Sequence, residues 1–321
     1  MLCAALAPWA IAVICIAVVF FAVAAYALGC YLGFYFIIVK PPVVSADRPN
    51  PLMGEDFAAF VKKTQEDAVI MKKLRSEPVE VVTRDGLTLR GEFYRAAEPS
   101  DITIVCLHGY NSNAYGDYAT RGLSYLHSGY NVLLANHRHH GKSDGKYIGF
   151  GVLDRHDVLK WSEAAAKLVP GGKIFISGVS MGGATAMQCA CLALTPDVKG
   201  IIEDCGYTTV REEVEYLAKK MFGFVPKLTI KFIEFYMRKI AGYGMSEADS
   251  REAVRHSKVP MLFIHGSDDE FVPTFMGKEC YEACTAPKEL VLIEGAGHAQ
   301  SYFKDAAKCA EAVDAFISRY K

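Results

Sequence analysis

The run that decides the fold is Ser177-Gly178-Val179-Ser180-Met181-Gly182-Gly183, which follows the pattern Gly-x-Ser-x-Gly. Before it, the apolar run 173–176 predicts a buried strand, and after it, residues 184–190 are rich in small helix formers. A strand, this pattern and a helix together indicate a nucleophile elbow, a sharp turn that exposes a serine hydroxyl at the top of a sheet. Gly178 and Gly182 suit such a turn because they let the backbone approach closely. Ser180 is therefore the candidate nucleophile.

Composition and cysteine usage argue against several classes of protein. The chain has 321 residues, of which 51% are hydrophobic, and a formal net charge of −1. This length suits one large or two small domains, and the balanced charge does not favour nucleic acid as a partner. The ten cysteines are scattered, mostly in apolar runs, and form no Cys-x-x-Cys pair. We therefore predict reduced, buried thiols, no metal site and no cofactor.

The N-terminus carries a long apolar segment without a charged side chain, from Leu2 to Val39. As a helix, residues 9–39 would extend ~46 Å at ~1.5 Å per residue, which exceeds the ~30 Å hydrocarbon core of a bilayer. Trp9 lies near one end and Tyr31 and Tyr35 near the other, where interfacial aromatic side chains belong. The segment therefore predicts contact with a membrane through residues 9–39.

Two rival interpretations of this segment are weaker. A signal peptide would need a basic n-region and an apolar core of roughly 7–15 residues, and the segment has neither. Residues 27–30 are faintly similar to a lipoprotein cleavage site, but the chain stays apolar beyond them. We predict a single-pass transmembrane anchor over residues 1–40. Because lysine and arginine follow it from Lys40 onward, the positive-inside bias predicts a cell-membrane protein with its catalytic domain in the cytoplasm.

The rest of the chain divides into a connector and an α/β domain. Residues 41–77 predict a linker and a helix at about 54–76, and residues 78–321 alternate strand-like and helical runs. This alternation predicts a mostly parallel central sheet with helices on both faces, preceded by a hairpin whose turn is Asp85-Gly86. The expected strands are 79–83, 87–94, 102–107, 130–135, 173–176, 200–204, 261–264 and 290–293.

Candidate catalytic groups follow three of these strands. In such a sheet, reactive groups gather at the carboxyl ends of the strands. Ser180 follows one end, His298 follows a later one, and Asp268 and Asp269 follow a strand between them. Serine is a weak nucleophile near neutral pH, so it needs a histidine base and an acid that fixes the tautomer of that base. The order serine, aspartate, histidine is the one that this architecture uses.

From about residue 79 to residue 320, the chain resembles α/β-hydrolase-fold serine hydrolases of the esterase or lysophospholipase type. The run 265–273, His-Gly-Ser-Asp-Asp-Glu-Phe-Val-Pro, resembles the His-Gly-x-x-Asp-x-x-Val-Pro motif of that family. The resemblance implies that Asp269, and not Asp268, is the acid of a Ser-His-Asp triad.

Two further motifs carry the same resemblance. His108-Gly109-Tyr110 resembles the oxyanion loop of the family, which implies the backbone N–H groups of Tyr110 and Met181 as oxyanion donors and a structural His108. The run 138–143 resembles an Arg-Gly-His-Gly-x-Ser turn, with His139 in place of the usual glycine, so a changed backbone is expected there.

A histidine cluster and a helical segment complete the candidates. The cluster of His137, His139 and His140 lacks carboxylate or cysteine partners, so we do not predict a metal site there. The segment 207–257 interrupts the alternation, is aromatic and helical in texture, and lies where this fold inserts a cap. By the resemblance, such a cap would supply a substrate pocket and exclude water.

The sequence therefore predicts a membrane-anchored serine hydrolase that cleaves carboxylic esters or thioesters through an acyl-enzyme. Lipid-like and small-molecule esters are the candidate substrates, and no oligomeric state is predicted. Two alternatives stay open. One is a peptidase, amidase or acyltransferase that uses the same triad, and the other is an inactive binding protein.

Overall fold

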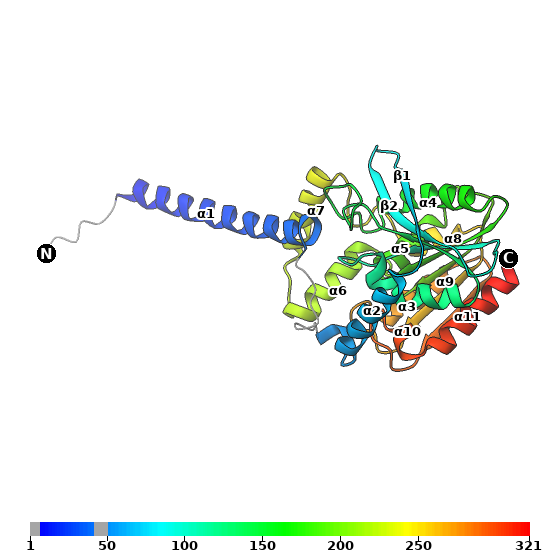
Figure 1. The fold of residues 1–321 in the computed structure, drawn as a ribbon. Helices are drawn as coiled ribbons and strands as arrows, with labels where there is room; N and C mark the ends of the chain where they lie inside the picture. The colour runs from blue at the N-terminus through cyan, green and yellow to red at the C-terminus, as the bar shows by residue number, and fades with distance from the viewer. Residues whose placement is uncertain (1–6, 42–50) are drawn as a thin grey trace.

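The fold is built on an eight-stranded sheet with the strand order β1-β2-β4-β3-β5-β6-β7-β8 (Figure 1). The computed structural model describes residues 7–41 and 51–321, so the first residues of the predicted anchor and the predicted linker at 42–50 lie outside the described residues. The strands are β1 (Glu77–Val82), β2 (Thr88–Tyr94), β3 (Ile102–Leu107), β4 (Asn131–Ala135), β5 (Lys173–Val179), β6 (Val198–Asp204), β7 (Met261–Gly266) and β8 (Lys288–Ile293).

The sheet is mostly parallel, which confirms the predicted fold class. Strands β1 and β2 form the predicted antiparallel hairpin, and β2 also pairs with β4 in an antiparallel manner. All other neighbours pair in parallel. Every residue of β3, β4 and β7 is buried, because helices cover both faces of the sheet and leave no face for polar side chains.

Two apolar cores lie on the two faces of the sheet. One core contains Trp161 and includes side chains from the helices α4, α5, α8 and α9. The other contains Phe316 and includes side chains from α2, α3, α10 and α11. These helices are α2 (Phe57–Met71), α3 (Ala114–His127), α4 (Asp154–Leu168), α5 (Met181–Cys189), α8 (Ser250–Arg255), α9 (Thr274–Ala283), α10 (Ser301–Lys304) and α11 (Ala306–Tyr320).

The N-terminal helix projects away from the rest of the chain (Figure 1). Helix α1 (Pro8–Phe34) continues as a π-helical turn to Val39, and this stretch of 32 residues is long and apolar enough to cross a membrane. Most of its side chains are exposed, as expected for a helix that contacts lipid and not protein. It is therefore a candidate transmembrane span.

The segment 207–257 is helical, as predicted. It contains α6 (Val210–Phe222), α7 (Lys227–Tyr236), a π-helical turn (Met237–Ala241) and α8. Helix α7 packs against the C-terminal part of α1, where the hydroxyl groups of Tyr26 and Thr229 lie 2.6 Å apart and Tyr236 donates to the Ala27 carbonyl at 3.1 Å. The C-terminal part of α1 is thus joined to this helical segment.

Candidate active site

Ser180 sits in a strained turn between β5 and α5. Its φ is 55° and its ψ is −118°, a conformation that a residue with a side chain rarely adopts and that costs about 1–3 kcal/mol. The Ser180 N–H donates to the Asp204 carbonyl at 2.8 Å, which ties the turn to the end of β6. A Cβ on Gly178 would lie 2.0 Å from the Gly182 carbonyl oxygen, and a Cβ on Gly182 would lie 1.9 Å from the Leu107 carbonyl oxygen. Only glycine fits at these two positions.

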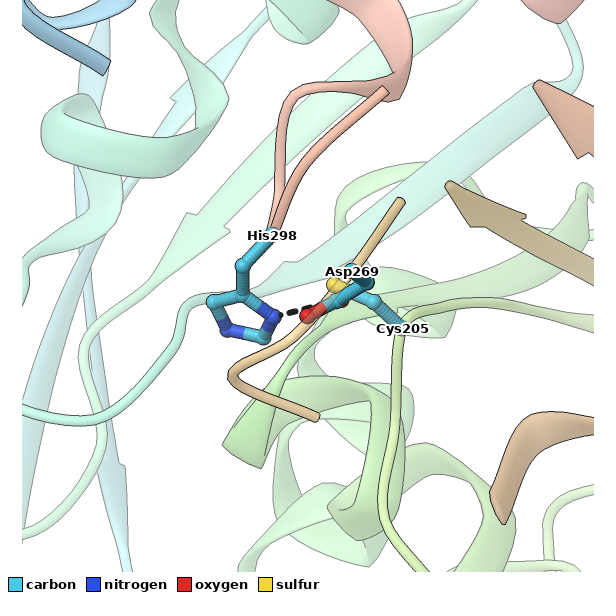
Figure 2. Close-up of side chains that lie close together, drawn as sticks. All are labelled: Cys205, Asp269 and His298. Carbon is cyan, nitrogen blue, oxygen red and sulfur yellow. Dashed lines mark hydrogen bonds and ion pairs between the residues drawn. The ribbon is translucent and has the colours of Figure 1, made fainter. Parts of the chain in front are cut away.

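The structure brings the three predicted side chains together. His298 Nε2 lies 2.9 Å from Ser180 Oγ, and His298 Nδ1 lies 2.7 Å from Asp269 Oδ2 (Figure 2). All three residues are buried, with Ser180 8% and His298 3% exposed. Asp269 is fixed from its other oxygen, which accepts from the N–H groups of Phe271 and Val272, both at 2.9 Å.

Asp268 does not join this group. It is exposed, and its carboxylate accepts from the Ser267 hydroxyl at 2.6 Å. The geometry therefore separates the two neighbouring aspartates: Asp269 faces His298, and Asp268 faces its own turn.

A second histidine, His265, stands beside Asp269. Its Nε2 donates to the Val272 carbonyl at 3.0 Å and lies 3.4 Å from Asp269 Oδ2. Burial alone would raise the pKa of Asp269, but His298 and His265 outweigh it and lower that pKa to about 2. Burial alone would lower the pKa of His265, but Asp269 and Glu203 raise it to about 9. Asp269 is therefore a stable carboxylate in an almost dry site.

The loop after β3 lies against the serine. A Cβ on Gly109 would be 3.2 Å from Ser180 Cβ, so the loop backbone passes directly beside Ser180. This loop is held by Asp117, which accepts from the Gly109 N–H at 2.5 Å and from the Ser112 hydroxyl at 2.9 Å. Tyr110 follows Gly109 in this loop, and Met181 follows Ser180 at the start of α5. Both predicted oxyanion donors thus belong to backbone that adjoins the serine.

The side chain of Tyr110 contacts the π-helical turn that follows α1. Its hydroxyl donates to the Ile37 carbonyl at 2.9 Å, and its ring stacks on Phe150 with 5.0 Å between the ring centres. The loop beside Ser180 is therefore fixed partly by the last turn of the N-terminal apolar segment.

A buried ion pair, which the sequence did not indicate, connects helix α3, the end of β6 and the loop that carries His298. Arg121 Nη2 donates to Asp204 Oδ2 at 2.6 Å and to the Ala299 carbonyl at 3.0 Å. The second oxygen of Asp204 accepts from the Ser301 hydroxyl at 2.9 Å. Arg121 therefore holds the loop that carries His298 against the strand end that also binds the Ser180 N–H.

The histidines after β4 pack around His108. The ring centre of His108 lies 4.7 Å from that of His137 and 4.8 Å from that of His140. Burial lowers the pKa of His108 well below its usual value and that of His140 to about 4, so both rings are neutral. His108 accepts from the His137 N–H at 3.2 Å, so it connects the loop after β3 to the loop after β4.

His139 occupies the position where the resembling family has glycine. Its φ is 63°, in the left-handed region that favours glycine, and its Nε2 lies 2.7 Å from the Val39 carbonyl oxygen. The contact with Val39, at the end of the N-terminal apolar segment, therefore accompanies a backbone conformation that is less favourable for histidine than for glycine.

Among the described residues, Cys205, Asp269 and His298 form the one group of three whose possible ligand atoms are close enough to hold a metal ion. The Cys205 sulfur lies with the ligand atoms of Asp269 and His298 within 4.8 Å, as Figure 2 shows. Burial raises the pKa of the Cys205 thiol well above its usual value, and the other two groups are already bonded to each other. Because metals bind the thiolate and not the thiol, these three residues are better described as a buried thiol packed beside a hydrogen-bonded pair than as a cation site.

Glu213 is a buried carboxyl group on α6 without a partner. Neither of its oxygens has a hydrogen bond within the part of the chain that the structure describes. Burial, and then the charge of Asp269, raise the pKa of Glu213 well above its usual value. Glu213 therefore keeps its proton to a higher pH than an exposed glutamate does.

Comparisons with known proteins point to the same fold. The family described as serine aminopeptidase, S33, matches residues 98–246, a range that contains Ser180 and Tyr110 but ends before Asp269. The uncharacterized protein YqkD of Bacillus subtilis is 28% identical over 233 residues, which cover 72% of this chain and 76% of that protein. The lysophosphatidylserine lipase ABHD12 of Danio rerio is 28% identical over 213 residues, or 64% of this chain. The chain spans about half the length of that relative, 54%.

Solved structures are also similar. The esterase Pf2001 of Pyrococcus furiosus has a TM-score of 0.64 and 22% identity, and the match covers 88% of this chain and 98% of that one. Est1E of Butyrivibrio proteoclasticus, a structure with bound ferulic acid, has a TM-score of 0.59 and 19% identity, with coverage of 75% and 98%. The chain therefore has the α/β-hydrolase fold, and its similarity to esterases and lysophospholipases supports a serine hydrolase that acts on esters.

The elbow geometry predicts a large effect of one methyl group. Gly182→Ala should lower the free energy of unfolding by at least about 3 kcal/mol or prevent folding, because the new Cβ would meet a backbone oxygen at 1.9 Å. Gly183→Ala is the matched control, since its Cβ would lie 3.0 Å from the nearest atom. Denaturant unfolding of the purified variants measures both. Equal stabilities for the two variants would contradict this account of the turn.

Replacement of the buried Glu213 by glutamine should stabilise the protein by an amount that depends on pH. The folded pKa of Glu213 lies above its unfolded pKa, so ionising it costs stability as pH rises above about 4.3, by up to about 1.4 kcal/mol per pH unit. Glu213→Gln removes that cost and should stabilise the protein relative to wild type increasingly from pH 5 to pH 7. Thermal unfolding at several pH values tests this, with the exposed Glu215→Gln as control. A Glu213→Gln difference that stays constant with pH would refute it.

Proposed function

We propose that this serine hydrolase cleaves carboxylic esters or thioesters with Ser180 as nucleophile, His298 as general base and Asp269 as the orienting acid. The observation that carries the proposal is the unbroken chain of contacts from Ser180 Oγ to His298 and from His298 to Asp269, at 2.9 and 2.7 Å. In this chain Nε2 accepts the serine proton and Nδ1 donates to the carboxylate. The tautomer that a general base needs is thereby fixed.

The reaction then follows from the positions of these groups. Ser180 Oγ attacks the carbonyl carbon while its proton passes to His298 Nε2, and the imidazolium that forms is stabilised by Asp269. The oxyanion forms beside the backbone N–H groups that we assign to Tyr110 and Met181. His298 gives its proton to the leaving group, and water, activated by the same histidine, hydrolyses the acyl-enzyme and restores Ser180.

We further propose that the substrate is an amphiphilic, lipid-like ester taken from a membrane. Helix α1 supports this because 32 apolar residues suffice to span a bilayer, and the relative from Danio rerio is named a lysophosphatidylserine lipase. In this proposal residues 1–40 are the anchor, 41–77 the connector and 78–321 the hydrolase domain, with a cap at about 207–257. The basic residues that follow the anchor favour a single pass through the cell membrane with the domain in the cytoplasm.

Cleavage of an amide is the second candidate. The description of the matching family as a serine aminopeptidase favours it, since Ser-His-Asp sites can act on both kinds of bond. Transfer of the acyl group to an acceptor other than water would use the same acyl-enzyme. An inactive binding protein is the weakest alternative, because nothing in its binding would require the contacts of Ser180, His298 and Asp269.

The two adjacent aspartates provide a matched test of the mechanism. Asp269→Asn should lower kcat about 10⁴-fold because the wrong histidine tautomer is favoured, whereas Asp268→Asn should change it less than about threefold. Ser180→Ala should lose labelling by a fluorophosphonate probe and lose about 10⁶-fold in kcat. Steady-state hydrolysis of a nitrophenyl ester gives the rates. Full activity in Asp269→Asn, or labelling that persists in Ser180→Ala, would disprove the assignment.

Substrate class is tested by a panel of acyl nitrophenyl esters and aminoacyl nitroanilides. We expect kcat/KM to rise with acyl-chain length and to exceed that of the amides at least about tenfold, because apolar contact contributes about 0.8 kcal/mol per buried CH₂. Faster cleavage of the amides would instead support a peptidase. A product in which the acyl group is joined to an added alcohol would support a transferase.

A further inference from the structure

The surface formed by α6 and α7 exposes large apolar side chains beside the anchor. Phe222, the last residue of α6, is 72% exposed, and Phe224, in the connection to α7, is 79% exposed. The full set, which we call the apolar tip, is Met221, Phe222, Phe224, Leu228 and Phe235. Soluble proteins rarely leave several large apolar side chains together in water, so this surface points to a partner.

Helix α7 divides its faces between the anchor and this surface. Thr229 and Tyr236 contact α1, and Ile233 lies beside Gly33 of α1. Leu228 and Phe235 of the apolar tip are separated by seven residues, so they share another stripe of the same helix. The exposed stripe therefore runs next to the exposed apolar side chains of α1.

The length of α1 sets the level at which α7 would meet a bilayer. Together with the π-helical turn to Val39, α1 forms an apolar stretch of 32 residues that extends about 48 Å, whereas the hydrocarbon core is about 30 Å thick and needs about 20 residues. If the span begins at Pro8, the core is filled at about residue 27, and the contacts with α7 begin at Tyr26 and Ala27. Helix α7 then lies at the boundary between acyl chains and headgroups. Figure 1 shows α6 and α7 on the side of the domain from which α1 projects.

Lysine side chains surround the apolar tip. Lys219, Lys220, Lys227, Lys231 and Lys239 are all exposed on α6, α7 and the turn that follows. Only Lys220 has an ion-pair partner, Glu270, within the described ranges 7–41 and 51–321. Cations at this level attract the anionic headgroups of a cytoplasmic leaflet, by about 1 kcal/mol per side chain.

We propose that the apolar tip is a second membrane contact, inserted into the anionic leaflet from which α1 emerges. This inference rests on the proposed anchor, and it adds that the helical segment itself enters the boundary region, as amphipathic interfacial helices do. The end of the same anchor binds Tyr110 through the Ile37 carbonyl. Insertion of the tip would therefore hold the site around Ser180, which is itself buried, at the membrane surface where lipid esters lie.

Depth-dependent fluorescence quenching tests the insertion. The full chain carrying Trp9→Phe and Phe224→Trp is placed in vesicles of phosphatidylcholine and phosphatidylglycerol that contain acyl-chain nitroxide lipids. The tryptophan at position 224 should be quenched several-fold more than one introduced by Val82→Trp, an exposed position on the β1–β2 hairpin. The buried Trp161 gives the same background in both variants. Equal quenching at the two positions would overturn the proposal.

A rate measurement separates this proposal from the proposed function. The double variant Phe222→Asp/Phe224→Asp should hydrolyse a long-chain ester held in the vesicles about tenfold more slowly than wild type, and a soluble short-chain ester at the same rate. Val82→Asp is the control and should alter neither rate. Unchanged rates on both esters in the double variant would refute insertion. Cross-linking of two copies of the chain through position 224, with no quenching of the tryptophan at that position, would also refute it, because a second protein molecule would then cover the tip. A wild type that hydrolyses neither ester, or does not stay with the vesicles, would instead refute the proposed function.

Discussion

The backbone of Ser180, held at a φ of 55°, is the constraint on which the rest of the site depends. A serine in this conformation points its side chain away from both neighbouring elements, but it is stable only where the surroundings prevent relaxation. Gly178 and Gly182 allow the strand, the turn and the helix to approach within van der Waals contact, and the Asp204 carbonyl binds the Ser180 N–H. Burial of β3, β5 and β6 on both faces offsets the strain, since these strands cannot shift without opening two cores.

Asp204 extends this constraint to the histidine loop. Its backbone carbonyl binds Ser180, and its carboxylate binds Arg121 and Ser301. A buried ion pair adds little net stability, because desolvation cancels most of the attraction, but removal of one partner leaves a charge without compensation. We therefore infer that the Arg121–Asp204 pair mainly positions the site. It fixes the end of β6, which binds the Ser180 N–H, relative to the loop that carries His298.

How much of this was predictable depends on the range of the interactions. The strands and the nucleophile elbow were predictable because periodicity and the glycine pattern are local, and the predicted fold class is confirmed. The start of helix α3 is set locally as well, because the Asn113 side chain caps it and accepts from the Tyr115 and Gly116 N–H groups. The pairing of Arg121 with Ala299, 178 residues away, has no local signal. Asp269 was separable from Asp268 only by resemblance to a family motif, since the two are adjacent and identical in chemistry.

The last turn of the N-terminal apolar helix is also part of the protein's interior. Phe34 and Ile38 are buried in the same core as Met181, the Ile37 carbonyl accepts from Tyr110, and the Ile38 carbonyl accepts from the Ile148 N–H. A shortened, water-soluble preparation that starts after residue 40 would therefore lack more than its attachment. It would expose apolar side chains of the core around Met181 and would lack the Ile37 carbonyl that binds the loop after β3, so its properties would differ from those of the full chain.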